Sequence, residues 1–356
     1  MERKGRSIYL DLIKAIAIIL VVFGHCIQYG SGSEFYLSES YFGNWIFKCI
    51  YSFHMPLFAL ISGYLFYFSL SRRGSILSLK REIVSVLIPV LAWSASYYLV
   101  FHSHEIIEYG IAVYIKNLIR YSLTGIWFLW AVFWCAIAVI LVNVLFKDKL
   151  IAYVVLLIAL IFIPEKLNSY CYVYLYPYFV CGYLWNKHNL QYTVRKLFST
   201  KWIIPLLCLL ALWIGLLTRF NYNSYIYTTH ISLSGKSWMT QLSIDLYRWF
   251  IGFIGSALIL VGGVFLNEAY VKTKLENKFC IINGFFDGLS YVGRHTLGVY
   301  CISFYLNNLL YLICESVSYS LLLIFFETVF MLAISIFFDW LIGRNELFRR
   351  IYLGGR

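Results

Sequence analysis

The sequence predicts an all-α polytopic membrane protein with about ten transmembrane helices and both termini in the cytoplasm. Of its 356 residues, 61% are hydrophobic and only 13% are charged, whereas about a quarter of a soluble domain is charged. Apolar stretches long enough to cross a bilayer recur along the whole chain, and no long polar block separates them. We therefore expect one integral membrane domain, residues 1–356.

Ten apolar stretches are predicted to span the membrane. They cover residues 8–28, 46–69, 83–101, 125–146, 149–164, 170–186, 202–218, 248–267, 290–313 and 320–342. The sixth is short and aromatic, which predicts either a kink at Pro177 or a partly interfacial position. The first follows basic residues but lacks a small-residue cleavage site, so we expect a retained span and not a signal peptide.

The basic residues alternate between the predicted loops. Twenty Lys and Arg residues lie in the two tails and in every second loop, and six lie in the opposite loops. Cytoplasmic loops carry the excess of basic residues, which places both termini in the cytoplasm. The net charge of +12 is therefore interpreted as a topology signal, and we expect no nucleic acid partner.

The cysteines and histidines do not predict a metal site. The nine cysteines are scattered without a CxxC pair, so they indicate neither a disulfide framework nor a zinc site. His102 and His104 stand two residues apart in a predicted short loop, a spacing more typical of solvated side chains. We expect no bound metal.

The first span carries ionisable side chains inside an apolar run. Asp11 and Lys14 lie near one end and His25 near the other. On a helix, Lys14 and His25 are separated by a rise of roughly 16 Å and share a face to within about 20°. Ionisable groups at membrane depth indicate function; alternatively, Lys14 reaches the headgroups and His25 is a packing residue. The charge count places Lys14 on the cytoplasmic side and His25 towards the outside.

A second histidine, His54, lies near the outer start of the next span. Because a short loop joins the two spans, we expect His25 and His54 to face one water-accessible cavity, where a neutral imidazole can accept a proton from a hydroxyl. Ser62 and Gly63 lie about two turns deeper. Gly63 allows close approach of a ligand or, equally, of another helix.

Two loop regions suggest binding surfaces. The predicted inner loop after the second span carries Arg72, Arg73, Lys80 and Arg81, which suit either phosphate binding or topology and anionic lipid. The outer loop 218–247 is rich in Tyr, Asn, Ser and Thr, which suits either a carbohydrate or an interfacial aromatic belt. Two functions fit this arrangement: transfer from an anionic cytoplasmic donor to a hydroxyl, or transport of lipid-linked saccharides.

Four motifs in order resemble one known family. They are LDLIKAIAIILVVFGH, FHMPLFALISGYLF, GIWFLWAVF and SYVGRHTLGVY, within about Tyr9 to Phe304. They resemble the membrane-bound acyltransferase-3 family, in the branch of fucose 4-O-acetylase-like and other surface-polysaccharide O-acetyltransferases. The resemblance implies a multi-pass enzyme of the inner (plasma) membrane. It also implies acetyl-CoA as donor substrate, a carbohydrate acceptor and no permanently bound cofactor.

The resemblance also implies roles for individual residues. Lys14 and His25 match a basic residue and a histidine of the family's first span, although Lys14 lacks the planar fork of the more usual arginine. His25 is the expected catalytic base, with Lys14 and His54 beside it. Arg81 best matches the donor-binding residues, supported by Arg72, Arg73 and Lys80. The expected cavity lining comprises Asp11, Ser62, Gly63, Trp127, Phe128, His295 and Ser303. Ser303 stands where many members have a histidine, so that role is absent or falls to His295.

Overall fold

The computed structural model describes residues 7–36, 38–163, 165–189, 203–231, 233, 237–276 and 280–355. Within these ranges the regular elements are all helices. Several basic residues of the charge count lie outside them: Arg3, Lys4, Arg6, Arg195, Lys196, Lys201, Lys236, Lys278 and Arg356. The chain divides into two compact units, which are described separately.

Unit 1 comprises Met1–Phe58, Leu197–Tyr222 and Phe250–Asp339, and unit 2 comprises Ala59–Lys196, Asn223–Trp249 and Trp340–Arg356. Three helices contribute residues to both units. They are α4 (His54–Glu82), α14 (Trp238–Glu276) and α17 (Leu321–Arg344).

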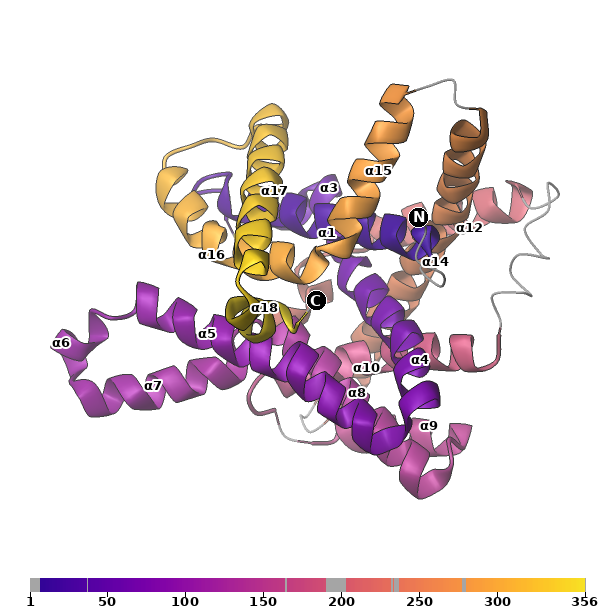
Figure 1. The fold of residues 1–356 in the computed structure, drawn as a ribbon, viewed down its shortest axis with the longest axis horizontal. Helices are drawn as coiled ribbons and strands as arrows, with labels where there is room; N and C mark the ends of the chain where they lie inside the picture. Colours follow the sequence, from indigo (N-terminus) through magenta and orange to yellow (C-terminus); the bar gives the residue numbers. More distant parts are fainter. Residues whose placement is uncertain are drawn as a thin grey trace. The chain divides into compact units, whose positions relative to one another are not determined.

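Unit 1 is built around the first helix. Its helices, besides parts of the three shared ones, are α1 (Ile8–Tyr29), α2 (Glu39–Gly43), α3 (Trp45–Tyr51), α12 (Ile203–Leu217), α15 (Cys280–Arg294) and α16 (Thr296–Ile313). Helix α1 packs against α15 and α16 (Figure 1). More than half of its residues are buried although only one, Asp11, is a buried charge, so this apolar helix forms the core of the unit.

Helix α1 and the α15–α16 segment run parallel with a constant sequence offset. A Cβ on Gly293 would collide with the carbonyl oxygen of Asp11, so only glycine permits this approach. Two further contacts, His25 with Asn307 and Ser33 with Glu315, each join residues 282 apart, the same offset as Asp11 and Gly293. The early and late parts of the chain are therefore paired over the whole length of α1.

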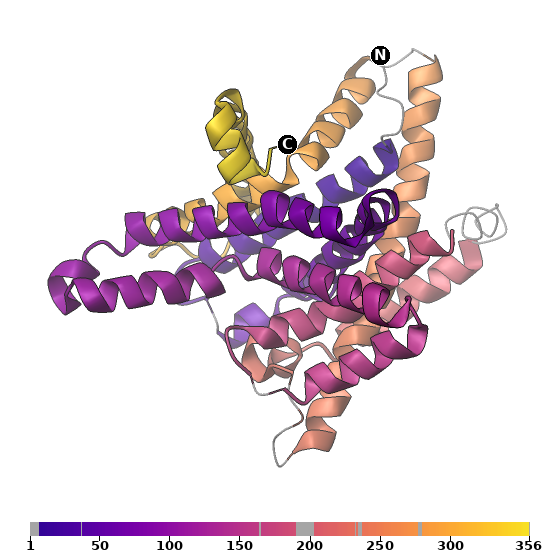
Figure 2. The ribbon, with the colours of Figure 1, turned by 60° about the horizontal axis from the view of Figure 1, so that its bottom comes forward.

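Unit 2 contains the middle of the chain. Its own elements are the π-helix η1 (Ile83–Leu87), α5 (Ile88–Phe101), α6 (Glu105–Tyr109), α7 (Ile111–Thr124), α8 (Trp127–Phe146), α9 (Leu150–Ile161), α10 (Ser169–Lys187), α13 (Ile226–Thr229) and α18 (Glu346–Leu353). Helices α5 and α7 lie side by side with α6 at their tip (Figures 1 and 2). Helix α10 packs against α8. It contains Pro177 and continues through this residue as one helix.

The structure changes several predicted boundaries. The stretch Trp45–Phe101 is helical almost throughout, so the basic residues 72–81 do not form a loop. Gly74 has φ 74°, a conformation that glycine adopts without strain, and it breaks α4 at a single residue. The predicted span 290–313 is interrupted at His295, between α15 and α16. The predicted outer loop 102–124 contains α6 and α7, and α14 extends beyond the predicted 248–267 at both ends.

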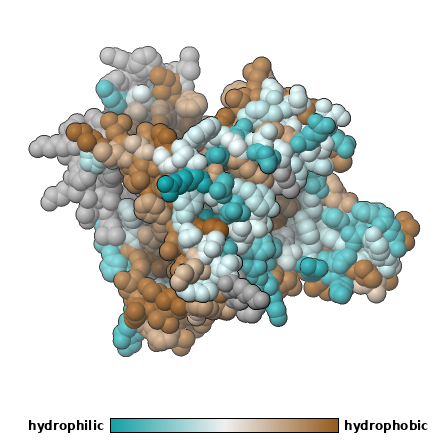
Figure 3. All heavy atoms as spheres, turned by 180° about the vertical axis from the view of Figure 1, so that it is seen from behind, coloured by the Kyte–Doolittle hydropathy of each residue, from teal (hydrophilic) through white to brown (hydrophobic). Residues whose placement is uncertain are grey.

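The exposed surface is unusually apolar for a water-soluble protein. By length and composition, six helical stretches within the described residues suit a membrane, and one of them, Trp45–Phe101, contains two predicted spans. Phe325, Phe326 and Phe330 of α17 are each more than half exposed. Figure 3 shows broad hydrophobic areas, in brown, on the face that it presents. Such surfaces belong in lipid, so the protein is a multi-pass membrane protein.

Candidate functional site

His25 is held by a residue from the other end of the chain. It lies on α1, and its Nδ1 is 3.1 Å from the amide nitrogen of Asn307 on α16. The Asn307 side chain is buried, and its Oδ1 has no hydrogen-bond partner within the described part of the chain. A buried amide oxygen without a partner is costly, and such groups often mark functional sites. We define His25 and Asn307 as the His25 site.

The orientation of the Asn307 amide decides what His25 can do. When the amide nitrogen donates to Nδ1, the single proton of a neutral imidazole resides on Nε2, which is then a donor. A half-turn of the amide places Oδ1 against Nδ1, which then carries the proton, and Nε2 becomes free to accept one. The same pair can therefore present a hydrogen-bond donor or a general base.

A polar network from α1 and α3 lies beside His54. The hydroxyl of Tyr51 donates to Oε1 of Gln28 at 2.9 Å, and Nε2 of Gln28 donates to the hydroxyl of Tyr36 at 3.3 Å. The rings of Tyr51 and His54 meet edge-on with centroids 4.8 Å apart. Nδ1 of buried His54 lies 2.7 Å from the carbonyl oxygen of Ile50, so it carries the proton and leaves Nε2 as the acceptor.

Lys14 forms an ion pair with Asp11. The Lys14 ammonium lies 2.8 Å from the Asp11 carboxylate, and the two side chains are 16% and 5% exposed. The i, i+3 spacing brings them together on one turn of α1. Lys14 therefore has a carboxylate partner on its own helix, at the position where α1 meets Gly293.

A histidine–aspartate pair lies at the junction of α15 and α16. Nδ1 of His295 bonds the buried carboxylate of Asp339 on α17, and the His295 ring stacks on Tyr291 with centroids 4.3 Å apart. A Cβ on Gly298 would also collide with Asp339. Ser303 is fully buried, and its hydroxyl donates to the carbonyl oxygen of Tyr300 at 3.0 Å.

The basic residues predicted to bind the donor all lie on α4 in unit 2. Arg72, Arg73, Lys80 and Arg81 are exposed and flank the break at Gly74. The hydroxyls of Ser69 and Ser78 lie 3.4 Å apart across this break. Four exposed cations are thus gathered on one short helical corner, which we call the basic corner.

The other predicted lining residues of unit 2 lie at helix contacts. Gly63 packs against the backbone of Phe179 on α10, where a Cβ would collide, and Ser62 beside it is partly exposed. Trp127 meets the Tyr227 ring of α13 edge-on at 5.8 Å, and Phe128 is buried. These residues position α4, α8 and α13 within unit 2.

The sequence did not single out Arg248, the largest fully buried side chain of the described residues. Its Nε donates to the carbonyl oxygen of Ser224 at 3.0 Å, and Nη1 donates to Asp245 at 3.0 Å and to the carbonyl of His230. Nη2 donates to the carbonyls of Asn223 and Tyr225 at 2.8 and 3.0 Å and to the Thr229 hydroxyl. We call residues 223–230 with Arg248 the Arg248 loop.

Two residues of these sites, Asn307 and Asp339, were not predicted, although the sequence contains an indication of both. Asn307 and Asp339 lie inside predicted apolar spans, where polar side chains usually face a protein interior or a cavity. The same reasoning that singled out Asp11 therefore applied to both. Within the described ranges, no group of three His, Cys, Asp or Glu side chains is arranged to hold a metal ion.

Comparisons with known proteins relate the chain to one family. The model of an acyltransferase domain family, Acyl_transf_3, matches residues 7–342. The chain is 26% identical over 307 residues to nodulation protein NolL of Mesorhizobium japonicum, covering 84% of this chain and 76% of that protein. It is 37% identical over 136 residues to nodulation protein NolL of Sinorhizobium fredii, covering 36% of this chain and 34% of that protein. No solved structure matches the chain.

A family match over nearly the whole of a polytopic helical chain defines the class: the protein is a membrane-bound acyltransferase. The chain belongs to the acyltransferase-3 family. Of the two functions that the sequence left open, acyl transfer is therefore favoured over transport.

Proposed function

We propose that the protein moves an acetyl group from cytoplasmic acetyl-CoA to a sugar hydroxyl of a cell-surface or lipid-linked glycan, in the inner (plasma) membrane. Family membership supports acyl transfer. The observation that carries the catalytic assignment is the contact of His25 with the buried, under-bonded Asn307. It gives an imidazole in an apolar helix a defined orientation and a choice of tautomer.

His25 is the general base in this mechanism. After the half-turn of its amide, Asn307 accepts a hydrogen bond from the Nδ1 proton at Oδ1, and Nε2 of His25 removes the proton from the acceptor hydroxyl. The hydroxyl oxygen forms a bond to the thioester carbonyl carbon, and the carbon–sulfur bond then breaks. The coenzyme A thiolate leaves and takes the proton from the imidazolium, which restores neutral His25. The products are the O-acetylated sugar and coenzyme A.

Other predicted residues have supporting roles in the proposal. The basic corner of Arg72, Arg73, Lys80 and Arg81 binds the phosphates of the donor. The proton on Nδ1 of His54 is held by the carbonyl oxygen of Ile50, so its Nε2 can only accept; a nearby hydroxyl or amide, and not His54, therefore polarises the thioester carbonyl. The Asp11–Lys14 pair stabilises the N-terminal end of α1, and the His295–Asp339 pair stabilises the N-terminal end of α16. Both ends lie on the predicted cytoplasmic side, away from His25 and Asn307.

The test replaces His25 and compares it with a histidine outside the site. In nanodiscs containing the purified protein, labelled acetyl-CoA and a glycan acceptor, His25→Ala should lower the transfer rate by at least about 100-fold. His104→Ala, which changes an exposed histidine, should retain the full rate. Normal transfer by His25→Ala would exclude His25 as the base. Absence of transfer by the unchanged protein with every acceptor would count against the enzyme assignment.

A further inference from the structure

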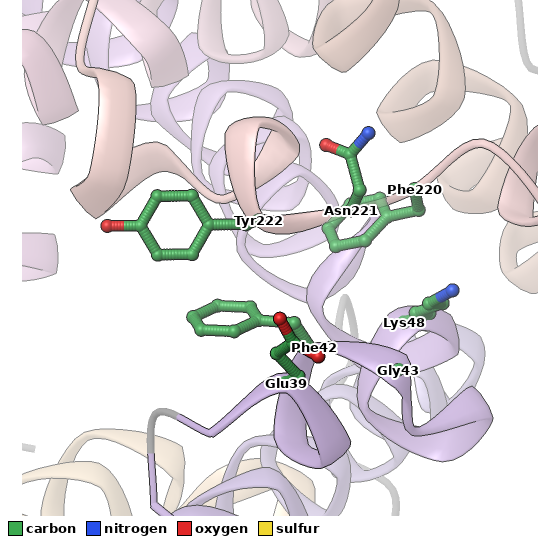
Figure 4. Close-up of a pocket in the computed structure, with 7 residues that line it drawn as sticks. All are labelled: Glu39, Phe42, Gly43, Lys48, Phe220, Asn221 and Tyr222. Atoms are coloured by element: carbon green, nitrogen blue, oxygen red, sulfur yellow. The ribbon is translucent and has the colours of Figure 1, made fainter.

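A pocket of about 450 Å³ lies in unit 1, near the C-terminal end of α1. Two short segments form it, and Figure 4 shows them facing one another across the opening. One segment contributes Glu39, Phe42, Gly43 and Lys48 from the α2–α3 region, and the other contributes Phe220, Asn221 and Tyr222 after α12. The charge distribution predicts that both segments lie on the outer side of the membrane.

Aromatic rings form the walls of this pocket. Phe42 and Tyr222 meet edge-on with centroids 4.9 Å apart; Phe42 is 6% exposed, and Tyr222, at 54%, presents most of the exposed ring surface. Buried Phe47 supports the walls from behind, because it contacts both Phe42 and Phe220 with centroids 5.8 and 6.4 Å apart. The walls are thus fixed by packing and do not have to form when a ligand binds.

The polar groups at the rim indicate the charge of the ligand. Glu39 and Lys48 have opposite charges, and both line the opening. An anionic ligand would be attracted by Lys48 but repelled by Glu39, and a lipid chain would form a hydrogen bond with neither charge. A neutral ligand with many hydroxyl groups satisfies both, because hydroxyls donate to carboxylates and accept from ammonium groups. The apolar C–H faces of a sugar ring also fit the aromatic walls.

The pocket is connected to the predicted catalytic histidines through a chain of packed rings. Phe47, behind the pocket, contacts Tyr51 with centroids 4.3 Å apart, and Tyr51 in turn contacts His54. The Tyr51 hydroxyl bonds Gln28, which lies less than one helical turn from His25 on α1. The pocket and the His25 site therefore share their supporting residues within unit 1.

We infer that this pocket binds a neutral saccharide unit of the acceptor, away from the hydroxyl that is acetylated. The inference rests on the proposed function for the identity of the acceptor. Binding at such a remote position orients the reacting hydroxyl and contributes binding energy that raises the rate of transfer. Sugars that lack this unit are then poor acceptors even when they carry the correct hydroxyl.

The experiment measures saccharide binding in the absence of donor. The whole protein in nanodiscs, which contain no sugar detergent, is titrated calorimetrically with methyl glycosides of glucose, galactose, mannose, rhamnose, fucose and N-acetylglucosamine, and with anionic methyl glucuronide. We expect binding of at least one neutral glycoside. Tyr222→Ala and Phe42→Ala should weaken it by about tenfold or more, a typical loss on truncating a central aromatic contact. Tyr109→Ala, a similarly exposed tyrosine outside the pocket, should leave it unchanged.

Two results would overturn the inference: no neutral glycoside binds, or Tyr222→Ala and Tyr109→Ala bind equally well. Tighter binding of methyl glucuronide than of every neutral glycoside would overturn the assignment of a neutral ligand. His25→Ala separates the pocket from the proposed reaction, because it should bind the glycoside normally while its transfer rate falls by at least about 100-fold. Binding without acetyl transfer by the unchanged protein would refute the reaction but keep the pocket. Acetyl transfer by Tyr222→Ala with an unaltered KM for the acceptor would support the reaction but refute the pocket.

Discussion

The Arg248 loop of unit 2 and the His25 site of unit 1 satisfy their polar groups in opposite ways. Arg248 is 2% exposed and directs every guanidinium nitrogen at an acceptor. Asn307 is 4% exposed, but it leaves its carbonyl oxygen without a partner among the described residues. A guanidinium with every nitrogen bonded is held in one orientation, although Oδ2 of its partner Asp245 has no partner among the described residues; the amide of Asn307, in contrast, keeps an interaction in reserve. We infer that Arg248 maintains structure and that Asn307 serves the reaction.

The largest expected effect is on the stability of the Arg248 loop. Arg248→Met removes one partner of a buried ion pair and leaves Asp245 and the loop carbonyls unpaired, which should cost about 3–5 kcal/mol. Thermal unfolding of the purified protein measures the loss as a lower Tm or as a lower yield of folded protein. Arg219→Met changes an exposed arginine and should melt like the unchanged protein. Equal melting of the two variants would show that the hydrogen bonds of Arg248 do not hold the loop.

The next effect is on catalysis at the His25 site. Asn307→Leu keeps the size of the side chain but removes the partner of His25 Nδ1, and it should lower kcat by about 10- to 100-fold, equivalent to about 1.4–2.8 kcal/mol. Asn307→Asp retains an acceptor for the Nδ1 proton and should recover part of the lost rate. Single-turnover transfer measures both rates.

The pair of Asn307 variants also distinguishes base from donor. If Asn307→Asp is as slow as Asn307→Leu while its Tm is normal, the amide N–H is the required group. His25 then acts as a hydrogen-bond donor at Nε2 and not as a base.

A smaller effect is expected at the basic corner. Arg81→Ala should raise the KM for acetyl-CoA by about 3- to 10-fold, since an exposed cation contributes about 1 kcal/mol to phosphate binding. The KM for the glycan acceptor should not change. Lys149→Ala, an exposed lysine elsewhere in unit 2, should change neither value. An equal loss for both substrates in Arg81→Ala would argue against a donor-side role.

The smallest effect concerns a second saturated charge in unit 2, Asp148. Burial raises the pKa of its carboxyl, but hydrogen bonds from Lys187, Tyr153, Tyr183 and Asn143 outweigh burial and hold the pKa below its usual value. The carboxylate therefore stabilises the fold above the unfolded pKa of about 3.9, and this contribution is lost as the pH falls through the lower folded pKa.

The pH dependence of Tm tests the role of Asp148. Asp148→Asn should melt below the unchanged protein from pH 5 to 8 by a nearly constant difference, because the carboxylate is ionised throughout that range. The difference should shrink as the pH falls below about 4. A difference that grows on acidification would mean that the hydrogen bonds to Asp148 do not lower its pKa.

The sequence predicted the features that depend on local spacing. The helical nature of the spans and the membrane location follow from hydropathy and helical periodicity. These features are determined by residues that lie close together in the sequence, so they can be predicted without knowing any distant contact. The number of spans and the orientation of the termini stay predictions.

Features that depend on distant contacts were not predictable. Asn307 becomes the partner of His25 only because α1 and α16 pack in parallel, and nothing near either residue specifies the other. The basic corner was predicted as a loop because a chain reversal usually takes several residues, whereas Gly74 breaks the helix alone. Arg248 was counted as a loop charge because its acceptors are backbone carbonyls, which every sequence contains.

The 282-residue offset between His25 and Asn307 bears on when the enzyme can become active. Synthesis proceeds at about 5–20 residues per second, so roughly 15–60 s separate the emergence of these two residues. During that interval α1 exists without the helix that orients its histidine. A chain truncated before Asn307 has His25, the basic corner and the outer loop, yet it lacks the partner of His25. In the proposed mechanism, acyl transfer therefore begins only after nearly the whole chain has been made.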